Sequence, residues 1–253
     1  GGGHGIGESL CRKLKERAAK AVVVVDINEA NAKRVADKIG GIAMAADVSK
    51  EADIQRVVSD TESQCGPIDL FVSNAGILVL DKSHAASCTN DQWERIWRVN
   101  VMAHVYAARA LLPGWIQRGH GYFVNTASAA GLLSQIGSAP YSVTKHAAVG
   151  FAESLAISHG DDGLKVSVLC PQAVRTGMTV RQDGDPIAGG DGGPAGRDGM
   201  LEPDPVADLV CEAVEQERFM ILPHPEVEKY MQRKTSDYDR WIHGMQRFRR
   251  HFV

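Results

Sequence analysis

The chain is predicted to fold as one α/β domain over residues 1 to 253: a doubly wound parallel sheet with helices on both faces, in three α/β/α layers. Two observations predict this fold. Strand-like apolar runs alternate with helix-like segments, and such alternation implies parallel strands joined by right-handed crossovers. A glycine-rich loop also opens the first helix, and an acidic residue ends the strand that follows, which is typical of such sheets.

The individual elements are predicted in chain order from the periodicity of their apolar residues. Helices are expected near 7 to 19, 29 to 39, 50 to 64, 91 to 112 and 140 to 159. Strands are expected at 21 to 26, 42 to 46, 68 to 73, 121 to 126, 165 to 170 and 219 to 222. Because ligands of these sheets bind beyond the carboxyl ends of the strands, functional residues should follow the strands.

The glycine-rich loop is a candidate phosphate site that comprises Gly1, Gly5, Ile6 and Gly7. Backbone N–H groups and the positive end of a helix dipole attract a pyrophosphate there, and a side chain would hold it away. A glycine-rich start is also typical of a frayed terminus. Because such a loop normally follows a strand, we expect a strand to precede Gly1 in the natural protein, without which the sheet lacks its first strand.

Asp26 favours the phosphate interpretation, because it ends an apolar strand 19 residues beyond Gly7. An acid at this position accepts hydrogen bonds from the adenosine ribose hydroxyls and repels a 2′-phosphate. NAD is therefore the expected cofactor, and NADP is less favoured. The neighbouring Ile27 is assigned to the same cofactor site.

Tyr141 and Lys145 lie one helical turn apart, and Ser128 lies 13 residues before Tyr141, just after a strand-like run. Positions i and i+4 share a helix face, so the ammonium can sit beside the phenol. A free phenol has a pKa of about 10, and a neighbouring cation lowers it. This constellation suits proton exchange with a carbonyl or alcohol during hydride transfer.

Tyr230 and Lys234 repeat the same spacing and provide a comparison within the chain. No apolar strand and no hydroxyl turn precede this second pair, and its surroundings are typical of a solvated helix. We interpret it as structural, so the context, and not the spacing, selects Tyr141 and Lys145.

Together these motifs resemble those of the short-chain dehydrogenase/reductase family, over essentially the whole chain apart from the first strand. The glycine pattern of that family maps onto Gly1, Gly5 and Gly7. Asp47 and Val48, after the strand expected at 42 to 46, resemble its adenine-contacting acid and the neighbour of that acid. The resemblance implies a Rossmann-type sheet.

Three further segments carry the resemblance. Asn74, Ala75 and Gly76 are similar to the Asn-Ala-Gly turn that lies beside the cofactor in this family, and Asn100 matches its catalytic asparagine within a long helix. Residues 171 to 176 resemble its Pro-Gly segment, which receives the nicotinamide.

Within that segment, Pro171, Val174 and Thr176 are assigned to the cofactor site, and Gln172 departs from the usual glycine. The Gly-, Asp- and Pro-rich stretch 177 to 200 resembles the mobile substrate lid of the family, and a plain surface loop is the alternative.

The resemblance implies an NAD(H)-dependent oxidoreductase that interconverts a secondary alcohol and a ketone. In that mechanism Tyr141 is the acid or base, Lys145 lowers the Tyr141 pKa and holds the nicotinamide ribose, and Ser128 binds the substrate oxygen. Asn100 supports a water molecule, and Thr176 anchors the carboxamide. Both Tyr141 and Lys145 therefore also count as cofactor-binding residues.

Four residues are assigned to the substrate: Gly131, Leu133, Gln135 and Met178. Two alternative functions remain open. One is an NAD-binding sensor or scaffold without turnover, and the other is a sugar-nucleotide epimerase or dehydratase, which usually has a larger C-terminal domain.

The composition favours a cytoplasmic enzyme with a small-molecule substrate. A net charge of −3 gives no preference for nucleic acid, and the apolar runs are too short to span a membrane. The five scattered cysteines indicate reduced thiols, and the histidines form no motif for a metal, so we expect none. The basic tail, 225 to 253, is expected to pack in a homodimer or homotetramer, with a solvated helix as the alternative.

Overall fold

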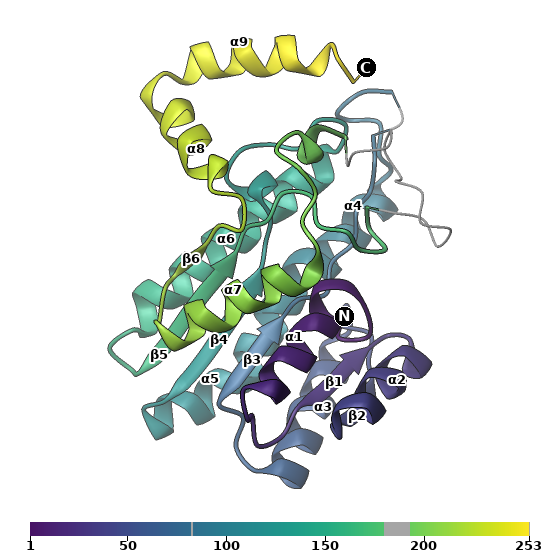
Figure 1. Cartoon of the computed structure of the whole chain (residues 1–253), viewed down its shortest axis with the longest axis vertical. Coiled ribbons are helices and arrows are strands. Elements are labelled where there is room, and N and C mark those ends of the chain that lie inside the picture. Colours follow the sequence, from purple (N-terminus) through teal and green to yellow (C-terminus); the bar gives the residue numbers. More distant parts are fainter. Residues whose placement is uncertain (82, 180–192, 253) are drawn as a thin grey trace.

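The computed structural model describes residues 1–81, 83–179 and 193–252 (Figure 1). Its strands are β1 (Val23–Asp26), β2 (Ile42–Ala45), β3 (Leu70–Ser73), β4 (Gly121–Thr126), β5 (Leu164–Leu169) and β6 (Met220–Ile221). Its α-helices are α1 (Gly5–Glu16), α2 (Glu29–Ile39), α3 (Glu51–Cys65), α4 (Asn90–Trp97), α5 (Ala103–Arg118), α6 (Ala139–His159), α7 (Pro203–Glu215), α8 (Glu226–Ser236) and α9 (Tyr238–Arg249). Shorter helical segments are the π-helix η1 (Arg98–Met102) and the 3-10 helices η2 (Ala129–Gly131) and η3 (Gly193–Gly196).

The strands are parallel and form two sheets among the described residues. One sheet pairs β1 with β2, and the other has the order β3-β4-β5-β6. The glycine loop lies at the break between β1 and β3: the Gly2 N–H donates to the Val25 carbonyl at 2.8 Å, and the Asn74 amide donates to the Gly1 carbonyl at 3.0 Å. The glycine loop therefore connects the two sheets through hydrogen bonds to both.

The core confirms the three-layer arrangement, because neighbouring residues of β4 face opposite layers. Phe123 packs with Trp115 of α5 and with residues of α6, whereas Val124 packs with Leu10 of α1 and Val206 of α7. Burial of these apolar side chains on both faces fixes the register of the central strand and directs its carboxyl end toward one edge of the sheet.

Two features of the helices differ from the prediction. The long helix expected at 91 to 112 is divided into α4, η1 and α5, and the π-helical turn η1 carries Asn100. Helix α7 was not predicted, although its apolar residues repeat at helical spacing after Pro203. A π-helical turn inside a helix often marks a functional site, because it redirects one side chain without ending the helix.

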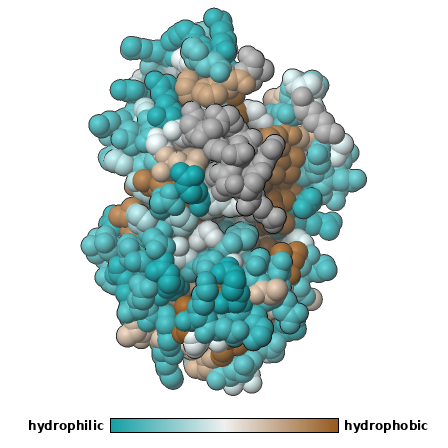
Figure 2. All heavy atoms as spheres, turned by 45° about the vertical axis from the view of Figure 1, so that its right-hand side comes forward, coloured by the Kyte–Doolittle hydropathy of each residue, from teal (hydrophilic) through white to brown (hydrophobic). Residues whose placement is uncertain are grey.

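Helices α8 and α9 extend beyond the carboxyl ends of the strands (Figure 1). Most of the predicted lid, 180 to 192, lies outside the described residues. On the face shown in Figure 2 the lower half of the molecule is mainly hydrophilic, and apolar side chains gather in the upper half. Among the described helices, none combines the length and the apolar character that a membrane crossing requires.

Candidate active site

Ser128 lies two residues beyond the end of β4, in a turn that its own side chain stabilises. Its hydroxyl accepts the Ala130 N–H at 3.1 Å, which caps η2, and donates to the Pro171 carbonyl at 3.3 Å. Ser128 is thereby held between the ends of β4 and β5, the place where the fold predicts a ligand.

Tyr141 and Lys145 lie on the first turns of α6, and Ser138 caps this helix by accepting the Tyr141 N–H at 3.3 Å. Lys145 is only 2 % exposed, and its Nζ donates to the Thr126 carbonyl at 2.9 Å. The same Nζ lies 5.6 Å from the centroid of the Tyr141 ring. The three predicted residues are therefore brought together at one point.

Burial dominates the acid–base properties of this pair. It raises the pKa of the Tyr141 phenol, an effect that the adjacent Ser128 hydroxyl partly offsets. It also lowers the pKa of Lys145 to about 8. Lys145, which the sequence analysis expected to lower the Tyr141 pKa, is not among the groups that shift it here, and its ammonium donates to the Thr126 carbonyl.

Asn100 projects from the π-helical turn, and its side chain is bound on all sides by the protein. Its Oδ1 accepts the Ile77 N–H at 2.9 Å, and its Nδ2 donates to the Ile77 carbonyl at 3.0 Å and to the Thr144 hydroxyl at 3.2 Å. A Cβ on Gly76 would lie 3.4 Å from the Lys145 Nζ and 3.5 Å from the Asn100 Oδ1. Asn100, Gly76 and Lys145 therefore form one packed group.

His104 is a buried neighbour of this group that the sequence analysis did not single out. It lies one helical turn after Asn100, with its Nδ1 2.7 Å from the Ser73 Oγ. Burial, followed by the charge of Lys145, lowers the pKa of His104 to about 3. His104 is consequently neutral at physiological pH and adds no second cation beside Lys145.

The glycine loop has the close packing expected of a phosphate cradle. A Cβ on Gly7 would lie 1.8 Å from the Gly1 carbonyl oxygen, so no side chain fits there. Gly5 has a φ of +57°, and a Cβ on it would lie 2.9 Å from the Thr176 Cγ2. This contact also shows that the segment predicted to receive the nicotinamide reaches the glycine loop.

Asp26 holds the glycine loop directly. Its Oδ2 accepts the Gly3 N–H and its Oδ1 the Asn28 N–H, both at 2.9 Å. Burial acts to raise the Asp26 pKa, but the Asn28 N–H, the ammonium of Gly1 and the Gly3 N–H together outweigh it, and the pKa lies below its ordinary value. With 4 % exposure, Asp26 supports the loop more than it faces solvent, whereas the next residue, Ile27, is 71 % exposed.

Two of the other predicted cofactor residues, Asn74 and Ala75, lie beside this loop. Asn74 donates to the Gly1 carbonyl and accepts the Thr126 hydroxyl at 3.1 Å, which links the loop to the end of β4. Ala75 is its neighbour: a Cβ on Gly1 would lie 3.0 Å from the Ala75 Cα. Asp47 instead stabilises its own turn, because its Oδ1 accepts the N–H and the hydroxyl of Ser49, and Val48 packs against the core.

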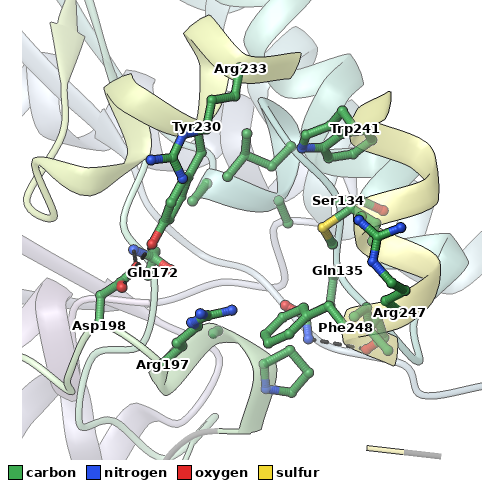
Figure 3. A pocket seen from close by; sticks show the side chains of 18 of the residues that line it. Ser134, Gln135, Gln172, Arg197, Asp198, Tyr230, Arg233, Trp241, Arg247 and Phe248 are labelled. Carbon is green, nitrogen blue, oxygen red and sulfur yellow. Dashed lines mark hydrogen bonds between the residues drawn. The ribbon is translucent and has the colours of Figure 1, made fainter. Parts of the chain in front are cut away.

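A cavity of about 690 Å³ opens beyond Ser128 (Figure 3). Two of the four predicted substrate residues, Leu133 and Gln135, line it. The other two do not. A Cβ on Gly131 would lie 2.4 Å from the Lys145 carbonyl oxygen, so this glycine permits close packing of η2 on α6, and Met178 donates its N–H to the Thr176 hydroxyl.

Gln172, the departure from the family glycine, joins the cavity through its side chain. Its Nε2 donates to the Asp198 Oδ2 at 2.8 Å, and the Tyr230 hydroxyl donates to the Asp198 Oδ1 at 2.9 Å. These bonds connect the segment after β5 to α8 through residues far apart in the sequence. No local pattern could have identified them.

The structural interpretation of Tyr230 and Lys234 agrees with the structure, and the neighbouring Glu228, Gln232 and Arg233 are exposed as on a solvated helix. Lys234 is buried and donates to the carbonyls of Leu132 and Leu133 at 2.8 and 3.2 Å, so it anchors α8 to the cavity rim. The C-terminal segment as a whole forms a wall of this cavity with its α8 and α9 residues, a position that neither of the two expectations for it included.

The fold and these residues define a dinucleotide-binding protein of the Rossmann type, with a serine, a tyrosine and a lysine at the carboxyl edge of its sheet. The family model described as short chain dehydrogenase matches residues 1–186. The chain belongs to this family of oxidoreductases.

Known relatives agree with this placement. The chain is similar to the CLA biosynthesis dehydrogenase/reductase of Lactiplantibacillus plantarum, with 30 % identity over 97 % of this chain and 94 % of the relative. It is 33 % identical to the meso-2,3-butanediol dehydrogenase of Serratia marcescens, over 71 % of each chain. Among solved structures, a short-chain dehydrogenase/reductase from Burkholderia phymatum in complex with NAD has a TM-score of 0.83 at 27 % identity, covering 94 % of this chain and 92 % of that one.

Proposed function

We propose that the protein is an NAD(H)-dependent oxidoreductase that interconverts a secondary alcohol and a ketone, with Tyr141 exchanging the proton. The observation that carries this proposal is the convergence of Tyr141, Ser128 and buried Lys145 at the carboxyl edge of the sheet, beside a cavity that Ser128 lines. The relatives named as dehydrogenases, one of them for a butanediol, support the same class of reaction.

The residues present fit a dinucleotide. The Gly5 and Gly7 positions form a cradle that a Cβ would fill, and Asn74 holds this cradle against β4. Gly1, Gly5, Ile6 and Gly7 would hold the pyrophosphate, and the segment from Pro171 to Thr176 would hold the nicotinamide. When bound, the nicotinamide supplies the hydride acceptor or donor.

Two observations favour NAD over NADP. Asp26 is ionised at the edge of the cradle, where it repels a 2′-phosphate. Arg34 donates to both Glu8 carboxylate oxygens at 2.7 Å and to the Gly3 carbonyl, so this guanidinium is already occupied. The Burkholderia phymatum structure holds NAD, and a Brucella melitensis 3-ketoacyl-(acyl-carrier-protein) reductase, 29 % identical with a TM-score of 0.75, holds NADH.

The chain's own residues then divide the proton chemistry. Tyr141 is protonated near neutral pH, because burial raises its pKa, and it gives this proton to the carbonyl oxygen during reduction. Ser128 donates a hydrogen bond to the same oxygen, and Lys145 holds the ribose. In the oxidation direction the phenolate must form, so alcohol oxidation should rise with pH. Asn100 fixes the packing behind Lys145.

The test is the change of nicotinamide absorbance with NAD or NADP and a panel of secondary alcohols and ketones, for the wild type and Tyr141→Phe. Loss of an acid–base group lowers the rate by about 10²- to 10⁴-fold, so Tyr141→Phe should reduce turnover by at least about 10²-fold. Tyr106→Phe on α5, away from the cavity, is the matched control and should retain activity.

If the wild type and Tyr141→Phe both bind NAD but neither turns over any substrate, the function is that of an NAD sensor and not of an oxidoreductase. Tightly held, non-exchanging NAD would instead favour the epimerase or dehydratase. The homodimer or homotetramer stays a prediction, which the molar mass in solution would test.

A further inference from the structure

The cavity beyond Ser128 has an unusual excess of positive charge. Four arginines line it: Arg197, Arg233, Arg240 and Arg247. Within residues 1–81, 83–179 and 193–252, none of the four has a carboxylate within ion-pair distance, whereas most other arginines of the chain do. Four guanidinium groups on one cavity are unexpected in a chain with a net charge of −3.

Two carboxylates, Asp198 and Asp237, line the same cavity and offset only half of this charge. Asp198 accepts the Gln172 amide and the Tyr230 hydroxyl. Asp237 accepts the Arg240 N–H at 2.9 Å and so caps α9. Even if both carboxylates are counted in full, the lining keeps a net charge of about two positive units.

The arginines are supported by aromatic rings, which orients their planar groups. The Arg197 guanidinium carbon lies 5.0 Å from the Phe248 ring centroid, and that of Arg233 lies 5.8 Å from the Tyr230 centroid. Figure 3 shows these side chains around the same opening, with Trp241 beside them. A guanidinium stacked on a ring keeps its N–H edge free for bidentate bonds to a carboxylate or phosphate.

The remaining lining is largely apolar. Leu133, Ile136, Ala195, Trp241, Met245 and Phe248 contribute to it. The same cavity thus has Ser128 at one end, apolar walls, and cationic groups supplied by Arg197, which follows η3, and by the two C-terminal helices. Its volume of about 690 Å³ falls within the range of about 300–1,000 Å³ that is common for small-molecule sites.

We propose that the substrate of this site is an organic anion: an apolar body that carries the alcohol or ketone, with a carboxylate or phosphate held by Arg197, Arg233 and Arg247. This inference rests on the proposed function and specifies its substrate class. The anion would bind at the C-terminal wall, and the apolar walls would cover the body between the anion and Ser128.

A binding experiment tests the substrate class without requiring turnover. Decanoate, decyl phosphate and neutral decanamide are titrated calorimetrically into the full-length protein at low and high salt. Both anions should bind at least about tenfold more tightly than the amide at low salt, and this advantage should shrink as salt is added. The tighter of the two anions identifies carboxylate or phosphate as the group recognised.

Variants locate the anion. The double variant Arg197→Gln/Arg233→Gln should lose about tenfold of the preference for anions, and the Arg247→Gln change should lose a smaller part. The matched control is Arg249→Gln/Arg250→Gln, which removes two exposed arginines that do not line the cavity and should keep the preference.

Equal affinity for decanamide and the anions, or an equal loss in the control variant, would overturn the inference. The experiments distinguish a wrong substrate class from a wrong proposed function. Turnover of neutral alcohols that depends on Tyr141, without any preference for anions, refutes only the substrate class. Preference for anions together with an unaffected Tyr141→Phe variant refutes only the catalytic assignment.

Discussion

Replacement of Lys145 by methionine should make the protein more stable while abolishing its turnover. Lys145 is 2 % exposed, and burial lowers its pKa from 10.5 to about 8. Keeping this ammonium charged inside the protein therefore costs folding free energy, which a catalytic role would justify. Methionine has a similar length and no charge, so it removes this cost without leaving a large cavity.

The magnitude follows from the shift in pKa. At about 1.4 kcal/mol per unit, the difference between 10.5 and about 8 corresponds to about 3 kcal/mol at neutral pH. Methionine also loses the hydrogen bond to the Thr126 carbonyl and leaves that oxygen unpaired, which costs about 2 kcal/mol. The Lys145→Met variant should thus be more stable than the wild type by about 1 kcal/mol.

The pH dependence gives the sharper assay. Between a folded pKa of about 8 and an unfolded pKa of 10.5, the unfolded chain binds more protons than the folded chain, so wild-type stability rises with pH. Below about pH 8 the full cost is present, and it disappears as the pH approaches 10.5. From about pH 7 to about pH 9.5 the wild type should gain about 2 kcal/mol relative to Lys145→Met.

Urea unfolding of both proteins at these two pH values measures the difference. Lys229→Met on α8 replaces an exposed lysine and is the matched control, for which no such pH-dependent difference is expected. A difference between Lys145→Met and the wild type that does not change with pH would refute the reasoning. So would a loss of more than about 2 kcal/mol at neutral pH, which would mean that the hydrogen bond outweighs desolvation.

Two other substitutions test the glycine packing. Gly7→Ala places a Cβ 1.8 Å from the Gly1 carbonyl oxygen, so the loop must move, and calorimetry should show NAD affinity reduced by at least about tenfold. An unchanged dissociation constant would show that the loop does not hold the pyrophosphate. Gly150→Ala lies in α6, where a Cβ meets no other atom within 4 Å, and it should stabilise the protein by about 0.5–1 kcal/mol. A urea midpoint that stays unchanged or falls would contradict this.

Local sequence signals predicted most of the elements that position the site. Helix α2 was expected at 29 to 39 and lies at Glu29–Ile39, because Asn28 accepts the Asn31 N–H at its start and Gly40 takes a φ of +61° at its end. The strand expected at 121 to 126 is β4. Ser128 follows the end of β4, and Tyr141 and Lys145 lie at the start of α6. The three residues meet because the lengths of the local elements determine where these ends lie.

Properties that depend on the environment were less accessible from the sequence. The spacing of Tyr141 and Lys145 predicted that they are close, but not the direction of the Tyr141 pKa, which burial determines. Asp26 was assigned to a ribose, yet its oxygens hold Gly3 and Asn28. In both cases the sequence indicated which residues lie close together, but not the burial and hydrogen bonds that fix their properties.

The cavity and the proposed catalytic residues draw on different parts of the chain, although Ser128 belongs to both. The family model ends at residue 186, whereas Arg197, Asp198 and all of α8 and α9 follow it. Gln172 joins these two parts through Asp198. Ser128, Tyr141 and Lys145 thus lie in the part of the chain that the family model matches, whereas the four arginines of the cavity lie beyond it. For this reason the substrate class has to be argued from the cavity's own charges and cannot be transferred from the butanediol dehydrogenase.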